Sequence, residues 1–156
     1  MEKSILYQEK QRTYLIFYVL LIVILAIELL AIIVQLVVAR DIMNAVPSLA
    51  LSIILFMAFS FVLINFFYLR LRITEEDFEV SYGVFRLRIP TEQILACQPA
   101  NFSWRTYLGW GMRPGLDGTF AWTSRGRKGV RIETKGRNYV ISTANADKIC
   151  EILSKS

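Results

Sequence analysis

The residues best suited to bind a ligand are basic side chains grouped in one short turn. The segment 124–129 (SRGRKG) places three cations within four positions, between two extended stretches. Near an anionic membrane surface each arginine or lysine contributes about 1 kcal/mol of attraction, so several together favour an anionic lipid or a phospho-ligand. The candidate contacts are Arg125, Arg127, Lys128, Arg105 and Arg113. The favoured interpretation of the turn is nevertheless a solvated hairpin tip, because cytoplasmic segments beside membrane spans are basic whatever they bind.

Catalytic and metal-binding chemistry finds little support in the sequence. The chain has no histidine, which removes the commonest general base and metal ligand, and it carries no phosphate-binding loop or nucleophile motif. Cys97 and Cys150 have no neighbouring cysteine and lie in apolar patterns, so they are expected as buried thiols. A bridge between them is the alternative, disfavoured because disulfides are rare in the cytosol. We expect no enzyme activity, no metal and no cofactor.

Two polar residues lie inside apolar runs and are candidates for contact with a partner. Glu28 stands near the middle of the first run, where an ionised carboxylate costs at least about 2.5 kcal/mol, and Gln35 follows two helical turns later on the same face. Their functional interpretation is contact with a partner subunit or, less favoured, an ion path. The alternative is a protonated Glu28 bonded to Ser52 or Ser60 of the second run.

Aromatic residues form a further candidate surface around the irregular stretch 101–118. Trp104 and Trp110, next to arginine and glycine, are the candidates for partner contact, since Trp and Arg are enriched at interfaces. Tyr107 and Trp122 are expected to fill the core instead. The stretch itself is expected to be a loop or a broken strand.

Two long apolar runs determine where all of these residues lie relative to a membrane. They cover about 14–39 and 49–69, and each exceeds the roughly 20 residues that a helix needs to cross a bilayer. A cleaved signal sequence is disfavoured because its apolar part is far shorter. The sequence therefore predicts a transmembrane helical hairpin over residues 1–69.

Charge asymmetry predicts the orientation of this hairpin. Three basic residues precede the first run, one lies in the connection, and several follow the second run. Since Lys and Arg favour the cytoplasmic side, we expect a multi-pass protein of the plasma membrane with both termini in the cytoplasm. The residues are Lys3, Lys10 and Arg12 before the first apolar run, Arg40 in the connection, and Arg70, Arg72, Arg86 and Arg88 after the second run.

The remainder, residues 70–156, is predicted to form one cytoplasmic domain rich in strands. Apolar residues alternate with polar ones along 69–74, 78–82 and 85–89, and extended structure is also expected over 94–98, 119–123, 130–134 and 137–142. From Ala146 the spacing becomes that of an amphipathic helix. We expect hairpins between 78–82 and 85–89 and between 130–134 and 137–142.

Short motifs in this half resemble the bacterial pleckstrin-homology-like (PH-like) domains of small prokaryotic membrane proteins. The matching segments are 72–74 (RIT), 78–80 (FEV), 82–83 (YG), 88–90 (RIP), 93–94 (QI), 139–143 (YVIST) and 145–147 (NAD). The resemblance implies a membrane α + β protein in which a bent antiparallel β-barrel is capped by a C-terminal helix. It implies no catalytic residues.

The expected function follows from strong anchoring without catalytic chemistry. We expect a non-enzymatic membrane-anchored interaction module, an accessory or assembly subunit of a membrane-protein complex or a homo-oligomer. The alternative is a domain that binds an anionic lipid or a phospho-ligand at the cytoplasmic membrane surface. Nucleic acid is not expected, because the chain is tethered to a membrane and has no motif of the standard modules.

Overall fold

The computed structural model describes residues 4–38, 42–101, 104–107, 109 and 111–155. These residues form two compact units: Tyr14–Phe67 on one side, and Met1–Thr13 together with Tyr68–Ser156 on the other. Each unit is built by its own sequence pattern, the first by helices and the second by two β-sheets and short helices.

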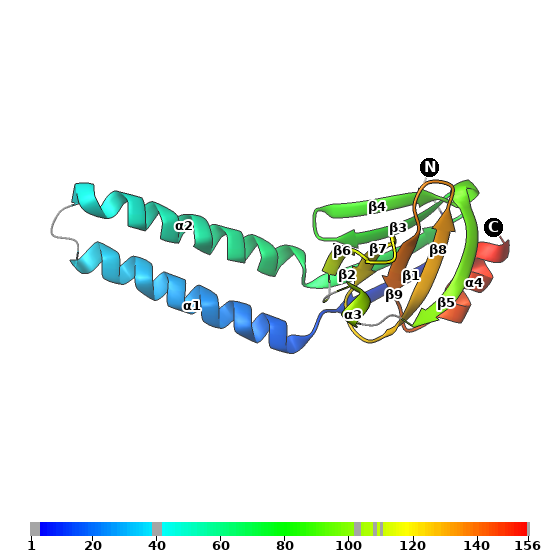
Figure 1. Ribbon diagram of the computed structural model, residues 1–156, viewed down its shortest axis with the longest axis horizontal. Coiled ribbons are helices and arrows are strands. Elements are labelled where there is room, and N and C mark those ends of the chain that lie inside the picture. The colour runs from blue at the N-terminus through cyan, green and yellow to red at the C-terminus, as the bar shows by residue number, and fades with distance from the viewer. Residues whose placement is uncertain (1–3, 39–41, 102–103, 108, 110, 156) are drawn as a thin grey trace. The chain divides into compact units, whose positions relative to one another are not determined.

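The first unit is a pair of antiparallel helices, α1 (Leu15–Val38) and α2 (Ile42–Asn65) (Figure 1). Both are long and apolar enough to cross a membrane, with mean hydropathies of 3.1 and 2.4 over their most apolar windows. Only 11% and 6% of those windows are buried within the protein. Exposed apolar surface of this extent must be covered by lipid or by another protein.

The boundaries of the second helix differ from the predicted 49–69. The helix extends from Ile42 to Asn65 and contains Pro47, whereas Tyr68 and Leu69 already belong to a strand. Apolar composition alone could not separate the helix from the strand, because both are apolar around residues 66–69. Pro47 lies inside α2, beyond its first turn, so the helix lacks the backbone hydrogen bond that an N–H at this position would donate.

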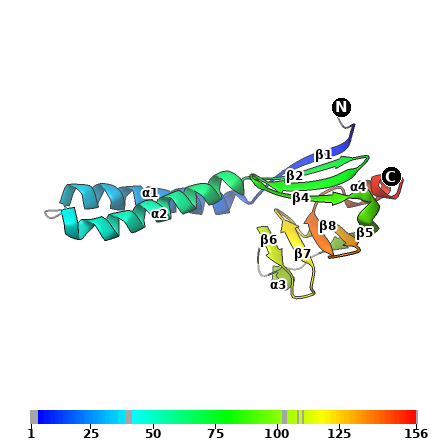
Figure 2. The same cartoon turned by 90° about the horizontal axis from the view of Figure 1, so that it is seen from above.

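The second unit contains two sheets that lie one above the other (Figure 2). The first has the order β1–β2–β3–β4, and all three neighbouring pairs are antiparallel. Its strands are β1 (Ile5–Arg12), β2 (Tyr68–Thr74), β3 (Asp77–Tyr82) and β4 (Phe85–Pro90). The hairpin predicted between 78–82 and 85–89 is confirmed by β3 and β4.

The second sheet has the order β5–β8–β9–β7–β6. Its strands are β5 (Ile94–Asn101), β6 (Gly111–Pro114), β7 (Phe120–Thr123), β8 (Lys128–Thr134) and β9 (Tyr139–Ser142). A 3₁₀ turn, η1 (Thr91–Gln93), precedes β5, and the short helix α3 (Trp104–Tyr107) precedes β6. The stretch expected to be a loop or a broken strand therefore contains α3 and β6, while Trp110 lies outside the described residues.

A closed antiparallel barrel does not form within the described residues, since the two sheets stay separate. One pair, β7 with β9, is parallel. This pairing arises because β8 already has β5 on one edge and β9 on the other, so β7 reaches the free edge of β9. The broad class, two apolar helices with an α + β domain, agrees with the prediction.

The core of this unit lies between the inner faces of the two sheets. Leu71, Ile73 and Phe78 from the first sheet and Val130 and Ile132 from the second are completely buried. Apolar residues alternate in these strands, so one face of each sheet is removed from water. Tyr107 and Trp122 are also buried, as expected.

The helix α4 (Ala146–Lys155) closes the chain, as its amphipathic spacing predicts. Its buried residues, Ile149 and Leu153, face the domain. A disulfide joins Cys150 of α4 to Cys97 of β5, so the expectation of two free thiols is wrong here. Fifty-three positions separate these cysteines, and only the packing of α4 against β5 brings them together.

The strand β1 is the element that the sequence pattern did not predict. Residues 5–12 are assigned above to the hairpin region 1–69, but they pair along β2, from Arg12 opposite Tyr68 to Ile5 opposite Thr74, and belong to the same compact unit as the β-domain. The inward residues of β1 are the half-buried Tyr7, Glu9 and Gln11, which are polar. Period-two hydrophobicity is therefore missing, and the usual strand signal is absent.

Candidate anion-binding site

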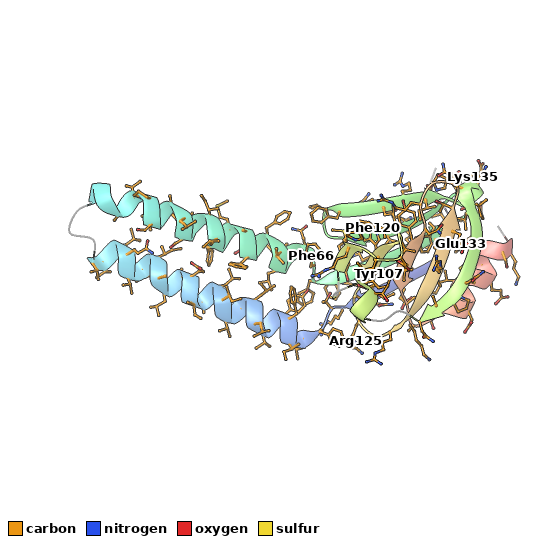
Figure 3. All side chains as sticks on the ribbon, in the orientation of Figure 1. Phe66, Tyr107, Phe120, Arg125, Glu133 and Lys135 are labelled. Carbon is orange, nitrogen blue, oxygen red and sulfur yellow. A yellow bond between two sulfur atoms is a disulfide. The ribbon has the colours of Figure 1, made fainter. Side chains whose placement is uncertain are left out.

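A basic cavity opens between β1 and the turn that precedes β8. Its volume is about 420 Å³, and it is lined by residues of β1, of the turn 125–128 and of the connection between β9 and α4. Five of the lining side chains are cationic: Lys10, Arg12, Arg125, Arg127 and Lys128. Figure 3 shows Arg125 at this end of the domain, while Lys135 lies at the opposite end of β8. Three separated stretches of sequence therefore build one concave, positively charged surface.

The cations of β1 lie on its outward face together with Tyr68 of β2. The Lys10 ammonium is 3.7 Å from the centre of the Tyr68 ring, and the Arg12 guanidinium carbon is 5.8 Å from it. Arg12 Nε also donates a 3.4 Å hydrogen bond to the Tyr68 hydroxyl oxygen. That hydrogen bond, together with the positive charges of Arg12, Lys10 and Arg70, lowers the pKa of Tyr68. The lowered pKa is a local sign of positive electrostatic potential.

The opposite wall of the cavity depends on a buried serine and a glycine. Ser124 is completely buried, and its amide donates a 2.8 Å hydrogen bond to the hydroxyl of Ser142. Gly126 has a φ of 89°, which a residue with a side chain rarely adopts. The turn thus changes direction at Gly126 and leaves Arg125, Arg127 and Lys128 exposed on its surface.

A hydrogen-bond network beneath the cavity joins its two walls. The amide group of Gln11 accepts a 2.7 Å hydrogen bond from Ser124 Oγ and donates a 3.2 Å hydrogen bond to the Ser142 carbonyl. Gln11 Nε2 also donates to Glu9 Oε1 at 2.8 Å. These contacts place Lys10 and Arg12 beside the basic turn, because both flank Gln11 in the same strand.

Glu9 anchors β1 to the start of α4. Its carboxylate accepts hydrogen bonds from Tyr7 Oη at 2.7 Å, from Thr143 Oγ1 at 2.6 Å and from the Ala144 amide at 3.4 Å. Burial raises the pKa of Glu9, but the hydrogen bonds from Thr143, Tyr7, Gln11 and Ala144 outweigh burial, so the net pKa is lowered. Glu9 is therefore held as a carboxylate below the cavity.

Four of the five cations around the cavity form no salt bridge with a described acidic side chain. These four cations are Lys10, Arg125, Arg127 and Lys128. A phosphate oxygen would accept charge-assisted hydrogen bonds from several of these groups at once. Chemically, the arrangement suits the binding of a multiply charged anion.

The other predicted anion contacts lie elsewhere. Arg113 is exposed on β6, outside the cavity lining, and the side chain of Arg105 is outside the described residues. Trp104 belongs to α3, but its side chain, like Trp110, is also outside the described residues. The predicted residues that come together are Arg125, Arg127 and Lys128. The sequence analysis uses Lys10 and Arg12 only to predict the membrane orientation. The alternation of Tyr7, Glu9 and Gln11 with these cations was the available signal that they share one face of a strand.

The polar residues of the helical unit are arranged differently from the expected pairing. Gln35 Nε2 donates a 3.0 Å hydrogen bond to Ser52 Oγ, so Ser52 is occupied by Gln35 rather than by Glu28. The Oε1 atom of Gln35 is buried without a hydrogen-bond donor. Glu28 is half-buried and has no hydrogen-bond or ion-pair partner among the residues that the structure describes.

No group of three or more potential metal ligands occurs among the described residues. Comparison with protein-family models, with curated proteins and with solved structures gives no match for this chain.

Proposed function

We propose that this chain is a non-enzymatic membrane-anchored module whose β-domain binds a phosphate-bearing anion in the cavity between β1 and the 125–128 turn. The observation that supports this function is the convergence of five cations on a cavity of about 420 Å³. Isolated surface cations are common, but cations from separate elements around one concavity are costly unless a counter-charge occupies it. The resemblance to PH-like domains adds the fold expectation and no ligand.

The proposed source of the anion is the membrane that the hairpin enters. Only Thr13 and Tyr14 separate Arg12 from the first residue of α1, and three residue steps span at most about 11 Å. Arg12 is therefore tethered close to the end of an apolar helix, where lipid headgroups gather. In this proposal the ligand is an anionic headgroup of the plasma membrane's cytoplasmic leaflet.

The proposed orientation places both termini in the cytoplasm, on the basis of the charge asymmetry. The disulfide between Cys97 and Cys150 favours a location of the β-domain outside the cytoplasm, because such bonds persist mainly in oxidising compartments. We favour the charge argument because it acts during membrane insertion, before the domain folds and the two cysteines meet.

The direct test is anion binding by the full chain in uncharged detergent micelles. Titration calorimetry compares inorganic pyrophosphate in solution with phosphatidic acid mixed into the micelles, and so separates a free phosphate from a headgroup. We expect Arg125→Ala with Arg127→Ala to weaken binding at least about tenfold, if each loses on the order of 1 kcal/mol. Binding that also weakens steeply with added salt agrees with this electrostatic origin.

A matched control removes two cations from the turn at the other end of β8. Lys135→Ala with Arg137→Ala lowers the net charge equally but leaves the cavity intact. Equal loss of binding in both double variants would show that the net charge of the protein, and not the cavity, attracts the anion. Absence of binding to both probes would refute the anion-binding function.

A second candidate function is assembly with another membrane protein or with a second copy of this chain. It is favoured by Glu28, which has no partner within the described hairpin, and by the unsatisfied Oε1 of Gln35 on the same helix face. Polar groups at membrane depth are stabilised by partners on neighbouring helices. Trp104 and Trp110 remain proposed contacts for such a partner.

This candidate is tested by the size of the complex in mild detergent. Glu28→Leu should dissociate an assembly that depends on the carboxyl, whereas Glu28→Gln should retain it because the amide still forms hydrogen bonds. A wild-type chain that migrates only as a monomer, or an assembly unchanged by Glu28→Leu, would exclude this role for Glu28.

A further inference from the structure

The strand β1 is attached to its domain in an unusual way. The inward residues of the neighbouring strands β2 and β3, such as Leu71 and Val80, are completely buried and apolar. By contrast, β1 turns Tyr7, Glu9 and Gln11 inward, where they bond to Ser124, Ser142, Thr143 and Asn145. Water can replace such hydrogen bonds, so a polar seam holds a strand less firmly than an apolar core does.

On the outward face of β1, repulsion between like charges acts against the contacts of Lys10 and Arg12 with Tyr68. Lys10 is directly opposite Arg70 in the β1–β2 ladder, and like charges at opposed positions destabilise a strand pair. Lys10 and Arg12 also share the cavity with Arg125, Arg127 and Lys128. Without an anion, the charges in the cavity therefore oppose the docking that the polar seam provides.

β1 also has a special place in the chain. Among the described strands β1 lies at the edge of its sheet and pairs with β2, and it continues into α1 after two residues. α2 likewise continues into β2 after Phe66 and Phe67. When β1 is docked, the pairing of Arg12 with Tyr68 holds the two chain segments that lead into the helices at the distance of neighbouring strands.

From these three observations we propose that β1 is a ligand-controlled latch. An anion in the basic cavity neutralises the repulsion between β1 and the 125–128 turn and locks β1 onto β2. Loss of the anion favours release of β1, which frees the start of α1 from the Arg12–Tyr68 pairing. The state of the cavity is thereby passed to the first apolar helix. This regulation rests on the proposed anion-binding function and adds a mechanical output to it.

The test is amide hydrogen exchange of the full chain in phosphatidylcholine nanodiscs. Exchange in residues 5–12 is measured without additive, with inorganic pyrophosphate, and with phosphatidic acid included in the nanodisc. We expect at least one anion to slow exchange of β1 about tenfold, as a change in local opening would. Exchange of β3 (Asp77–Tyr82), which lies in the apolar core, should stay unchanged.

Two variants on opposite faces of β1 supply the control. Gln11→Met removes the bonds to Ser124 and Ser142, and should speed exchange of residues 5–12 and weaken anion binding. Gln8→Met makes the same chemical change on the exposed face and should alter neither. Unchanged β3 protection in both variants verifies that the domain is folded.

The outcomes separate the latch from the binding function. Slower exchange with pyrophosphate supports a latch that responds to free phosphate, and slower exchange with phosphatidic acid alone supports one that responds to a headgroup. Calorimetric binding without any change in β1 exchange would overturn the latch and leave the anion site standing. Lack of binding would overturn both the latch and the anion site. Equal exchange of residues 5–12 in Gln11→Met and Gln8→Met would show that the polar seam is not the basis of the latch.

Discussion

The hydroxyl of Ser124 donates a 2.7 Å hydrogen bond to Oε1 of Gln11, across 113 positions of sequence. Ser124 is completely buried, and Gln11 also bonds to the Ser142 carbonyl at 3.2 Å. This contact attaches the strand before the first apolar helix to the turn that carries three of the five cavity cations. It links the chain segment that leads into α1 to the proposed site.

The first prediction concerns this bond. Ser124→Ala removes the donor to Gln11 and a contact of the Ser142 hydroxyl, and it should lower the free energy of unfolding by about 1–3 kcal/mol because buried polar atoms lose partners. Denaturant unfolding of the full chain in detergent measures the change. Ser81→Ala, on half-exposed β3 surface, is the control and should change stability by less than about 0.5 kcal/mol.

The second prediction concerns pH and Glu9. Because the folded state lowers the pKa of Glu9, its stabilisation of β1 is fully present above the unfolded value of 4.5 and is lost as pH falls through the lower folded value. Exchange in residues 5–12, corrected for the intrinsic rate, should accelerate below about pH 4.5. Glu9→Gln should remove this dependence; a variant with the same acid dependence as wild type would assign it to another carboxyl.

The third prediction concerns the link between the two sheets. The buried hydroxyl of Tyr82 on β3 donates a 2.8 Å hydrogen bond to the Thr123 carbonyl on β7. Tyr82→Phe keeps the ring that stacks on Trp122 but leaves this carbonyl without its donor, and should destabilise the domain by about 1–3 kcal/mol. Thermal unfolding followed by tryptophan fluorescence measures it. A neutral result would mean that this hydrogen bond contributes little to the attachment of the two sheets.

The fourth prediction concerns the disulfide. Joining Cys97 to Cys150 limits the unfolded chain, so the oxidised protein should be about 2–4 kcal/mol more stable than the Cys97→Ser, Cys150→Ser variant. Wild-type protein should lose this advantage in dithiothreitol, while the variant should be indifferent to the reductant. Equal response of both proteins would show that the bond contributes no stability.

The fifth prediction concerns orientation. In the cysteine-free background, Ser48→Cys in α2 near the connection and Ser4→Cys before β1 are labelled with a membrane-impermeant maleimide. Cytoplasmic termini predict that intact cells label position 48, and that position 4 labels only after lysis. The reverse pattern would place the β-domain outside the cytoplasm and agree with a persistent disulfide.

Local patterns in the sequence were sufficient for elements whose own residues carry the signal. Continuous apolar runs predicted two helices, and period-two alternation predicted the β3–β4 hairpin. The amphipathic spacing after Ala146 predicted α4. In each case burial of one face or of a whole segment leaves a repeating apolar pattern that can be read without the fold.

Only the tertiary structure decided the features that depend on distant partners. The inward face of β1 is polar because Gln11 and Glu9 meet hydroxyl and amide groups from the far end of the chain, so no apolar period marks it as a strand. The disulfide, the parallel β7–β9 pair and the gathering of Lys10 and Arg12 with Arg125 have the same origin. Such pairings depend on which edges and faces meet in space, and a single sequence does not carry that information locally.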